Sequence, residues 1–413
     1  MPNISKIIAD LYRTEFSKIT SVLGKLFGFE FIEIAEDIAS DTFLQATENW
    51  AAKGLPDNPT AWLYTVAKNK AKDYLKHDAV FRNKVIVQYP EQAQSTIEVD
   101  LSSKNIKDSM LRMMFAICNP NISTEAQIGL SLRILCGFSI DEIAAAFLSN
   151  KETINKRLFR AKEKLREEKV TLEFPETRQL DDKLNTVLTT LYLLFNEGYY
   201  SVSKNKTLRK DLCLEAMRLC YLLIENENTN KPVVNALIAL MCFHASRFDA
   251  RIATNGELIL YSDQDTSLWN KELIMQGKYF LNKAASGKSL SKFHLEAAIA
   301  YWHTEAQDTI EKWDHILQLY NKLLIVEYSP IAALNRTYAL AKVSGKPVAI
   351  TEALKLNLHQ NHLYHSLLGY LYTDVDNTLA YASYQQAHNL SKTANDKKVI
   401  LKHLENLASP KTN

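Results

Sequence analysis

Two helices joined by a very short break are predicted between Ser139 and Arg166, and no other stretch constrains the fold as strongly. Ser139 is a favourable N-cap, and Glu142 follows at the spacing of a capping box. Asn150 ends the break and can cap the second helix. Apolar residues recur at helical spacing in both helices: Ile140, Ile143, Ala144 and Phe147, then Ile154, Leu158, Ala161 and Leu165. The two helices must therefore pack as close neighbours.

The second of these helices is strongly basic. Between Lys151 and Lys169 there are eight Lys or Arg residues and four Glu residues, a local excess of +4. A helix, a tight turn and a basic second helix are typical of a helix-turn-helix, whose second helix enters the major groove of DNA. An ordinary αα-hairpin with a solvated basic face fits the spacing equally well.

In a helix-turn-helix, the basic helix offers two kinds of candidate DNA contact. Residues near its N-terminus are placed to reach base edges: Lys151, Glu152, Asn155 and Lys156. Residues further along are placed to bind phosphates, which positions a protein without reading sequence: Arg157, Arg160 and Lys164.

The composition favours an all-α protein with several domains. The chain has 413 residues but only 11 Gly and 10 Pro, so the turns between helices are short. Its net charge is +2, so affinity for nucleic acid must come from local patches. The five cysteines show no disulfide or metal spacing, and we find no signal peptide and no apolar run long enough to span a bilayer. These features indicate a cytoplasmic protein without a membrane segment.

Three helices are predicted in an N-terminal domain, residues 1–77, over residues 7–28, 31–50 and 59–77. The second is acidic. The third begins at Pro59 and carries lysines beside aromatic residues, which fits binding of phosphates and bases. A solvated lysine face on a surface helix is the more common arrangement. The candidate nucleic-acid contacts of this helix are Trp62, Lys68, Asn69, Lys70, Lys72 and Lys76, with Tyr64 and Tyr74 beside them.

Changes in pattern set the remaining boundaries. Residues 78–108 are polar, lack helical periodicity and contain Pro90, which is typical of a linker. Residues 109–169 hold two further helices followed by the basic helix pair. Residues 181–407 form a C-terminal extension of predicted helices. Within it, a polar excursion at 254–269 is expected to hold a short strand pair or an ordered loop.

Three stretches of the sequence, taken in chain order, resemble the sigma-70 family of RNA polymerase factors, in its extracytoplasmic-function group. AEDIASDTFLQA at 35–46 resembles the second conserved region, and PTAWLYTVAKNKAKDYLK at 59–76 resembles the stretch that melts and reads the minus-ten promoter element. The helix pair at 137–166 resembles the fourth region, which reads the minus-thirty-five element. The sequence departs from the family pattern at Ser40, at Leu148 where the turn usually has Gly, and at Lys151 and Glu152.

The resemblance implies a transcription initiation factor that binds core RNA polymerase and promoter DNA. It assigns the acidic helix to the clamp of the largest polymerase subunit, through Glu36, Asp37, Asp41 and Gln45. It assigns the minus-ten contacts to residues 59–76 and the minus-thirty-five contacts to the basic helix.

The C-terminal extension contains FNEGYY at 195–200, DLCLEA at 211–216, DQD at 263–265, and SP followed by LNR at 329–336. This combination resembles one sigma-factor subgroup that carries a C-terminal tetratricopeptide-like extension. Residues that match the repeat pattern are Leu368, Gly369, Tyr372, Ala380, Tyr384 and Ala387, with a weaker copy at Leu334, Asn335, Tyr338 and Ala353. Such repeats offer a groove for a protein partner, which we expect to regulate the factor.

We expect neither catalysis, nor a cofactor, nor a metal site. Phosphate-binding loops, nucleophile elbows and paired catalytic carboxylates are missing from the sequence. Glu257, Asp263, Gln264 and Asp265 have metal-binding side chains, but a capped, hydrogen-bonded loop is the more common arrangement. The alternatives to a sigma factor are a helical-repeat scaffold protein and a helix-turn-helix regulator of another kind, including one with a ligand-binding or enzymatic C-terminal domain.

Overall fold

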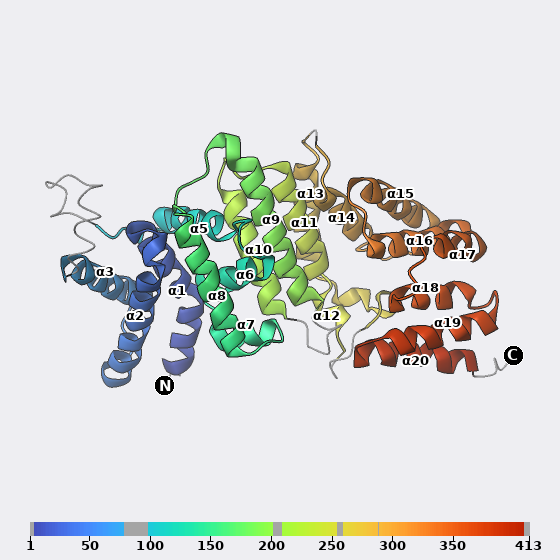
Figure 1. Ribbon diagram of the computed structural model, residues 1–413, viewed down its shortest axis with the longest axis horizontal. Helices are drawn as coiled ribbons and strands as arrows, with labels where there is room; N and C mark the ends of the chain where they lie inside the picture. Colours follow the sequence, from blue (N-terminus) through green and yellow to red (C-terminus); the bar gives the residue numbers. More distant parts are fainter. Residues whose placement is uncertain (1–3, 78–97, 201–208, 254–258, 288, 409–413) are drawn as a thin grey trace. The chain divides into compact units, whose positions relative to one another are not determined.

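The computed structural model describes residues 4–77, 98–200, 209–253, 259–287 and 289–408. Within these ranges all regular secondary structure is helical, and no β-strand occurs (Figure 1). The prediction of an all-α fold is therefore confirmed. The chain forms two compact units, residues 1–193 and 194–413.

The first unit contains both predicted N-terminal modules. Its elements are α1 (Ile4–Phe27), a 3-10 turn (Phe29–Phe31), α2 (Ile32–Lys53), α3 (Pro59–His77), α5 (Ser103–Ile117), α6 (Thr124–Leu130), a π-helical turn (Ser131–Leu135), α7 (Ile140–Ala146), α8 (Lys151–Glu167) and most of α9 (Thr177–Tyr199). The helix starts at Pro59 and Lys151 agree with the sequence-based predictions.

Helix α1 is the central helix of the first unit. It packs on α2 and α3 on one side and on α5 and the π-helical turn on another. Its core residues Phe16, Ile19 and Leu23 are fully buried. Gly24 allows the close approach of α5, because a Cβ there would lie 2.7 Å from the Cε of Met113. The two modules that the sequence analysis treats as separate domains thus share one core.

Two boundaries differ from those predicted. Helix α5 begins at Ser103, where Ser102 caps it, so residues 103–108 of the expected linker are helical. Residues after 169 also belong to the first unit, since the rings of Phe115 and Phe174 lie 5.5 Å apart and the hydroxyl of Thr190 donates to Gln127 over 2.7 Å. The first unit therefore ends inside α9, not at the predicted 169.

The second unit begins with the end of α9. Its further elements are α10 (Lys210–Glu225), α11 (Pro232–Ala245), α12 (Phe248–Arg251), two 3-10 turns (Tyr261–Asp263 and Thr266–Leu268), α13 (Lys271–Ala284), α14 (Lys292–Trp302), α15 (Ile310–Val326), α16 (Pro330–Ser344), α17 (Lys346–Lys355), α18 (His362–Tyr372), α19 (Asn377–Leu390) and α20 (Ala394–Ala408). The described part of the excursion at 254–269 is a loop with two 3-10 turns and no strand.

Helix α11 organises the first half of this unit. It is apolar and buried almost all round, and it packs on α10, α13 and α14. A helix without a polar face has to lie inside a bundle.

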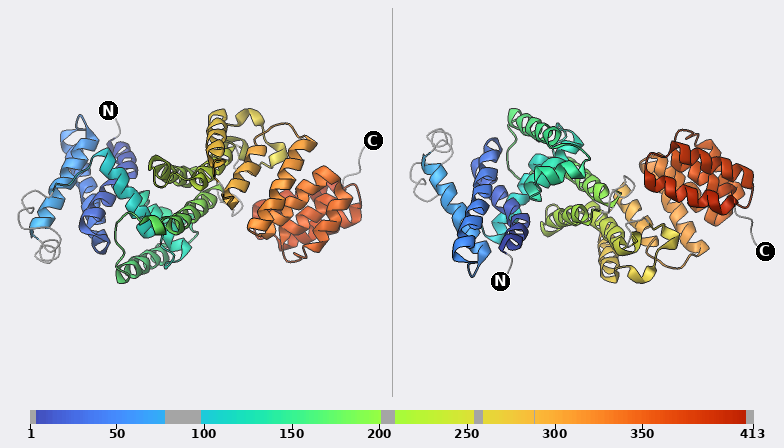
Figure 2. Two further views of the ribbon diagram at one scale, coloured as in Figure 1. Left: turned by 90° about the horizontal axis from the view of Figure 1, so that it is seen from above. Right: turned by 90° about the horizontal axis from the view of Figure 1, so that it is seen from below.

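From α15 to α20 each helix packs on the next, which gives a stack of helices at the C-terminal end (Figures 1 and 2). Helices α18 and α19 approach closely at Gly369, where a Cβ would lie 2.7 Å from the ring of Tyr384. These two residues are among those that match the repeat pattern. The paired, successive helices are what a helical-repeat architecture requires.

All five cysteines are free and buried. No helix in the described parts of the chain has the length and apolar character needed to cross a membrane.

Candidate nucleic-acid and polymerase interface

Local capping fixes the helix-turn-helix. The Ser139 hydroxyl accepts from the Glu142 backbone N–H at 3.2 Å, and the Glu142 carboxylate accepts from the Ser139 N–H at 2.8 Å, so the predicted capping box is present. The Asn150 side chain accepts from the Thr153 N–H at 2.8 Å and caps α8 as predicted. Ile154, Leu158, Ala161 and Leu165 are buried, so the opposite face of α8 is presented to solvent.

Leu148 occupies the left-handed position of the turn. Its φ is +53°, a region in which a side chain with a Cβ is strained and glycine is favoured. The side chain is exposed and so gains little burial in return. The departure from glycine at this position therefore has a conformational cost.

The exposed face of α8 carries most of the predicted DNA contacts. Lys151, Glu152, Asn155, Lys156, Arg160 and Lys164 are exposed, whereas Arg157 is half-buried with its guanidinium 5.5 Å from the ring of Phe147. Lys151 pairs with Asp141 at 3.0 Å and Lys164 with Glu168 at 3.6 Å. Among the described residues, neither Lys156 nor Arg160 forms an ion pair, so both cations are available to a ligand.

Phe159 lies on the same exposed face and was missed by the sequence analysis. Its side chain is 62% exposed on a helix whose other apolar residues are buried. The signal was available, because Phe159 falls outside the apolar spacing of the helix. An apolar side chain on this face suits contact with a thymine methyl group.

The aromatic residues of α3 face the protein more than solvent. Half-buried Trp62 stands edge-on to Trp50 with ring centroids 5.4 Å apart. The Tyr64 hydroxyl donates to Glu15 at 2.6 Å, and burial together with this carboxylate raises the pKa of Tyr64. Tyr74 packs 5.7 Å from the ring of Phe27. All three side chains are half-buried, so any stacking of bases on these rings competes with their contacts inside the protein.

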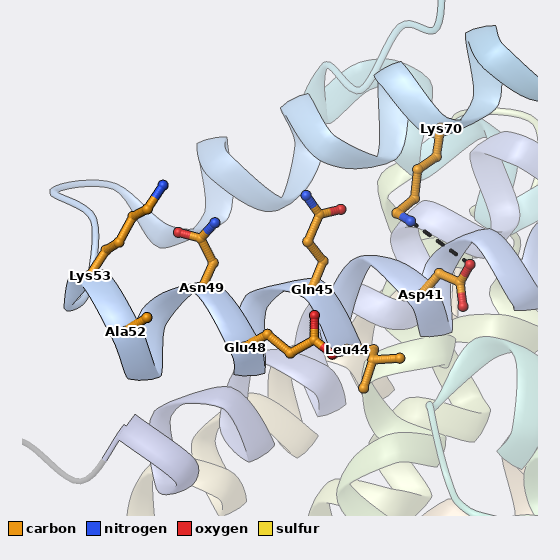
Figure 3. Close-up of a pocket in the computed structure, with 8 residues that line it drawn as sticks. All are labelled: Asp41, Leu44, Gln45, Glu48, Asn49, Ala52, Lys53 and Lys70. Carbon is orange, nitrogen blue, oxygen red and sulfur yellow. Dashed lines mark ion pairs between the residues drawn. The ribbon is translucent and has the colours of Figure 1, made fainter.

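The lysines of α3 fall on two faces. Lys72 and Lys76 are exposed and Lys68 is half-buried, and their spacing of four residues places them on one stripe, with exposed Asn69 beside it. Lys70 points elsewhere, toward Asp41 of α2 at 3.8 Å (Figure 3). The predicted minus-ten set is therefore brought together except for Lys70.

A shallow groove of about 530 Å³ runs along the outer face of α2. It is lined by Asp41, Leu44, Gln45, Glu48, Asn49, Ala52, Lys53 and Lys70 (Figure 3). Exposed Asp37 lies one turn before Asp41. Leu44 is 59% exposed in the middle of these polar side chains. Acidic groups around an exposed leucine suit a protein partner with basic and apolar surface.

Glu36, assigned with these residues to polymerase binding, lies on the opposite face of α2 and is 6% exposed. Its carboxylate pairs with Arg133 at 3.2 Å and with Lys162 of α8. In this conformation Glu36 is therefore not on the surface that carries Asp37, Asp41 and Gln45. The physical reason is that α8 packs against α2 and supplies the compensating charge.

Further ion pairs surround this contact. Arg166 of α8 pairs with Glu33, and its Nε donates to the carbonyl of Glu30 at 3.1 Å. Arg13 of α1 pairs with the capping residue Glu142 at 2.8 Å, and its guanidinium lies 3.8 Å from the ring centroid of Phe138. The helix-turn-helix is thus attached to the N-terminal helices by charges at several points.

Residues 11–79 match the sigma-70 region 2 family, and residues 183–285 match a family of unknown function, DUF6596. The chain is 30% identical over 388 residues to the uncharacterized protein R00370 of Rhizobium meliloti (strain 1021), with 92% of each chain covered. It is 26% identical over 161 residues to the RNA polymerase sigma factor YlaC of Bacillus subtilis (strain 168), which covers 38% of this chain and 90% of that protein. No solved structure matches.

Replacing Leu148 by Gly should stabilise the first unit by about 0.5–1 kcal/mol. Left-handed backbone costs a residue with a Cβ roughly 1–2 kcal/mol, and the greater freedom of unfolded glycine offsets part of that gain. Urea unfolding followed by circular dichroism measures the change. Leu148→Ala keeps the Cβ and is the matched control. If Leu148→Gly unfolds at the same or lower urea concentration than Leu148→Ala, the strain at this turn is not significant.

Proposed function

We propose that this chain, which belongs to one family with the Rhizobium meliloti protein and carries a sigma-70 region 2 domain, is a sigma factor that binds core RNA polymerase and directs it to promoter DNA. The observation that carries this proposal is the order of modules in the first unit: a region 2 domain followed by a capped helix-turn-helix with unpaired cations on its exposed face. The match to the Bacillus subtilis sigma factor spans 161 residues and 90% of that protein, which supports the proposal.

Helix α8 would read the minus-thirty-five element. Its exposed N-terminal residues are Glu152, Asn155 and Lys156, which are of the types that bond base edges in the major groove. Arg160 lies one turn further on and would bind a phosphate. The absence of a competing ion pair at Lys156 and Arg160 among the described residues supports this assignment.

Helix α3 would contact the minus-ten region. Lys68, Lys72 and Lys76 form a stripe that can follow a phosphate backbone, and Trp62 supplies one partly open aromatic face. Lys70 has a structural partner in Asp41 and is the least favourable member of the predicted set.

Core polymerase would bind the exposed face of α2. Asp37, Asp41 and Gln45 are accessible, and Leu44 adds an apolar contact at the centre. Glu36 would join this interface only after α8 has moved away from α2, because Lys162 and Arg133 enclose it.

We assign the protein to the extracytoplasmic-function group, with a tetratricopeptide-like C-terminal extension that regulates promoter use through a protein partner. The order of the two N-terminal modules supports the group assignment, and the stacked helices α15–α20 support the tetratricopeptide-like assignment. The proposal places the protein in the cytoplasm, where its partners are, and gives it no catalytic step.

Run-off transcription with purified core polymerase tests the central claim. Transcripts that start at defined positions only when this protein is present are the expected result. Polymerase that neither binds the protein nor changes its start sites would contradict the proposal and favour a scaffold protein or another class of helix-turn-helix regulator.

Two substitutions on α8 should have different effects on DNA binding. Lys156→Ala should lower discrimination by about 1–3 kcal/mol at one or two base pairs, because it removes a base contact. Arg160→Ala should weaken binding to all DNA sequences alike. It should also lower the slope of log K against log salt concentration by about 1, the value for one phosphate contact. Holoenzyme binding to promoter variants over a salt series measures both effects. Lys104→Ala, an exposed lysine on α5, is the control. Unchanged specificity and salt dependence in both α8 variants would rule out this docking.

Asp41→Arg should abolish binding to core polymerase while the fold is kept. Asp41 is exposed, and its ion pair with Lys70 is a long surface contact that contributes little to stability. Co-purification with core enzyme and thermal unfolding give the two readouts. Asp10→Arg places the same change on an exposed position of α1 and should bind normally. Equal recovery of polymerase with both variants would remove α2 from the interface.

Removal of the second unit should leave core binding intact but change transcription. Truncation after Leu193 keeps the part of α9 that packs on the first unit, including the Thr190 contact. Core affinity should equal that of the full chain, whereas promoter occupancy and transcript yield in cells should differ. Identical output from both proteins would show that the extension does not regulate the factor.

A further inference from the structure

The second unit contains a cluster of buried cationic and hydrogen-bonding side chains that the proposed function does not use. The cluster is built around two tyrosines, Tyr199 at the end of α9 and Tyr261 in the first 3-10 turn. The side chains around them come from α11, α12, the 3-10 loop, α14 and α15: His244, Arg247, Arg251, Trp269, His303 and Lys312.

Distances show that these side chains form one group. The Arg251 guanidinium lies 3.8 Å over the ring of Tyr199, and Arg247 donates to the Tyr199 hydroxyl at 3.4 Å. The same Arg247 lies 5.3 Å from the ring of Tyr261. Lys312 donates to the Tyr261 hydroxyl at 2.9 Å. Arg247 therefore stands between the two tyrosines.

The two histidines complete the group. The ring of His244 is 4.7 Å from the ring of Tyr199, and the ring of His303 is 5.0 Å from that of Tyr261. Burial lowers the pKa of His303 to about 3, helped by the positive charges of Arg247 and Lys312, and the pKa of His244 is lowered by burial and by both arginines. Both rings are thus neutral near pH 7, and the local potential is positive.

In the described parts of the chain, Arg247 and Arg251 have no carboxylate paired with them. Arg247 is only 8% exposed, yet neither it nor Arg251 forms an ion pair with any described residue. Two acids near the cluster have other partners: Asp308 pairs with Lys342 at 3.1 Å, and Glu305 pairs with Lys278 at 3.3 Å. A buried cation without a counter-charge costs several kcal/mol, so this arrangement is expensive unless an anion joins it.

Hydrogen-bonding capacity gives a second, independent indication. Buried atoms without a hydrogen-bond partner concentrate here: His244 Nδ1, Arg247 Nε, Arg251 Nε, Gln264 Oε1, Trp269 Nε1 and His303 Nδ1. All except Gln264 Oε1 can donate. Native proteins rarely leave so many buried groups unpaired in one place, and an acceptor placed among these atoms would satisfy several of them at once.

From these observations we propose that the second unit binds a small molecule bearing a carboxylate or phosphate group, held between Arg247 and Arg251 beside Tyr199 and Tyr261. Guanidinium forks bind both oxyanions in the same bidentate geometry. Arg247 is too deeply buried for a large ligand to reach it. Arg251 is less buried and lies 5.5 Å from the exposed ring of Tyr200, which gives a route from solvent. The site does not depend on the sigma-factor assignment.

The test uses the full-length protein with inorganic phosphate and citrate as separate probes, at matched ionic strength in chloride. One of the two should bind saturably by calorimetry and raise the Tm by about 5 °C at roughly a hundredfold excess over its Kd. Saturation by phosphate alone or by citrate alone identifies the oxyanion. The same Tm change in chloride, or no saturable heat with either probe at millimolar concentration, would overturn the proposal.

Substitution of Arg251 locates the site. Arg251→Gln should weaken binding at least about tenfold, since a charge-assisted hydrogen bond is lost. Arg251→Lys keeps the positive charge but not the planar guanidinium, so it should bind the anion with intermediate affinity. This conservative variant also distinguishes a loss of binding from a loss of folding. Arg336→Gln is the control, because Arg336 has its own partners in Asn321 and Glu352. Wild-type affinity in both Arg251 variants would show that the anion binds elsewhere.

Discussion

The arrangement of the first unit depends on the carboxylate of Glu36. It is buried between α2 and α8 and is balanced by Lys162 and Arg133. Removing one partner from a buried pair typically costs about 3–5 kcal/mol, whereas the pair itself adds little net stability. The contact therefore specifies how the helix-turn-helix sits on α2 more than it holds the unit together. Cohesion comes from the apolar core of α1, which packs on both modules.

This arrangement divides the functional surface into two parts. The exposed face of α8 and the groove on α2 are accessible at the same time, so DNA and a protein partner can each approach without a rearrangement. Glu36 is different, because exposing it means breaking its two ion pairs and moving α8. Water would rehydrate the charged groups of Glu36, Lys162 and Arg133 once they separate. Breaking these ion pairs therefore costs less free energy than exposing the buried apolar contact between α1 and α5.

Features that depend on neighbouring residues could be predicted from the sequence. The capping box at Ser139, the cap at Asn150 and the start of α3 at Pro59 depend on neighbouring residues, and all three agree with the structure. The burial of Glu36 could not be predicted, because the acidic helix pattern shows no sign of a partner 126 residues away. Tyr64 was taken as a base-stacking residue for the same reason, because its bond to Glu15 joins different helices. The cluster around Arg247 and Arg251 could not be predicted either, because its side chains lie far apart in the sequence, from Tyr199 to Lys312.

The two units use buried charge in opposite ways. In the first, an acid and two bases on different helices satisfy each other, so the site is electrically complete. In the second, Arg247 and Arg251 gather near neutral histidines and tyrosine hydroxyls, none of which carries a negative charge near pH 7. A fold that buries cations without acids is most stable when an anion is bound, because the ligand stabilises the folded state by mass action. If the proposed anion binds there, the stability of the second unit follows its concentration, which would give the proposed regulation through the extension a physical basis.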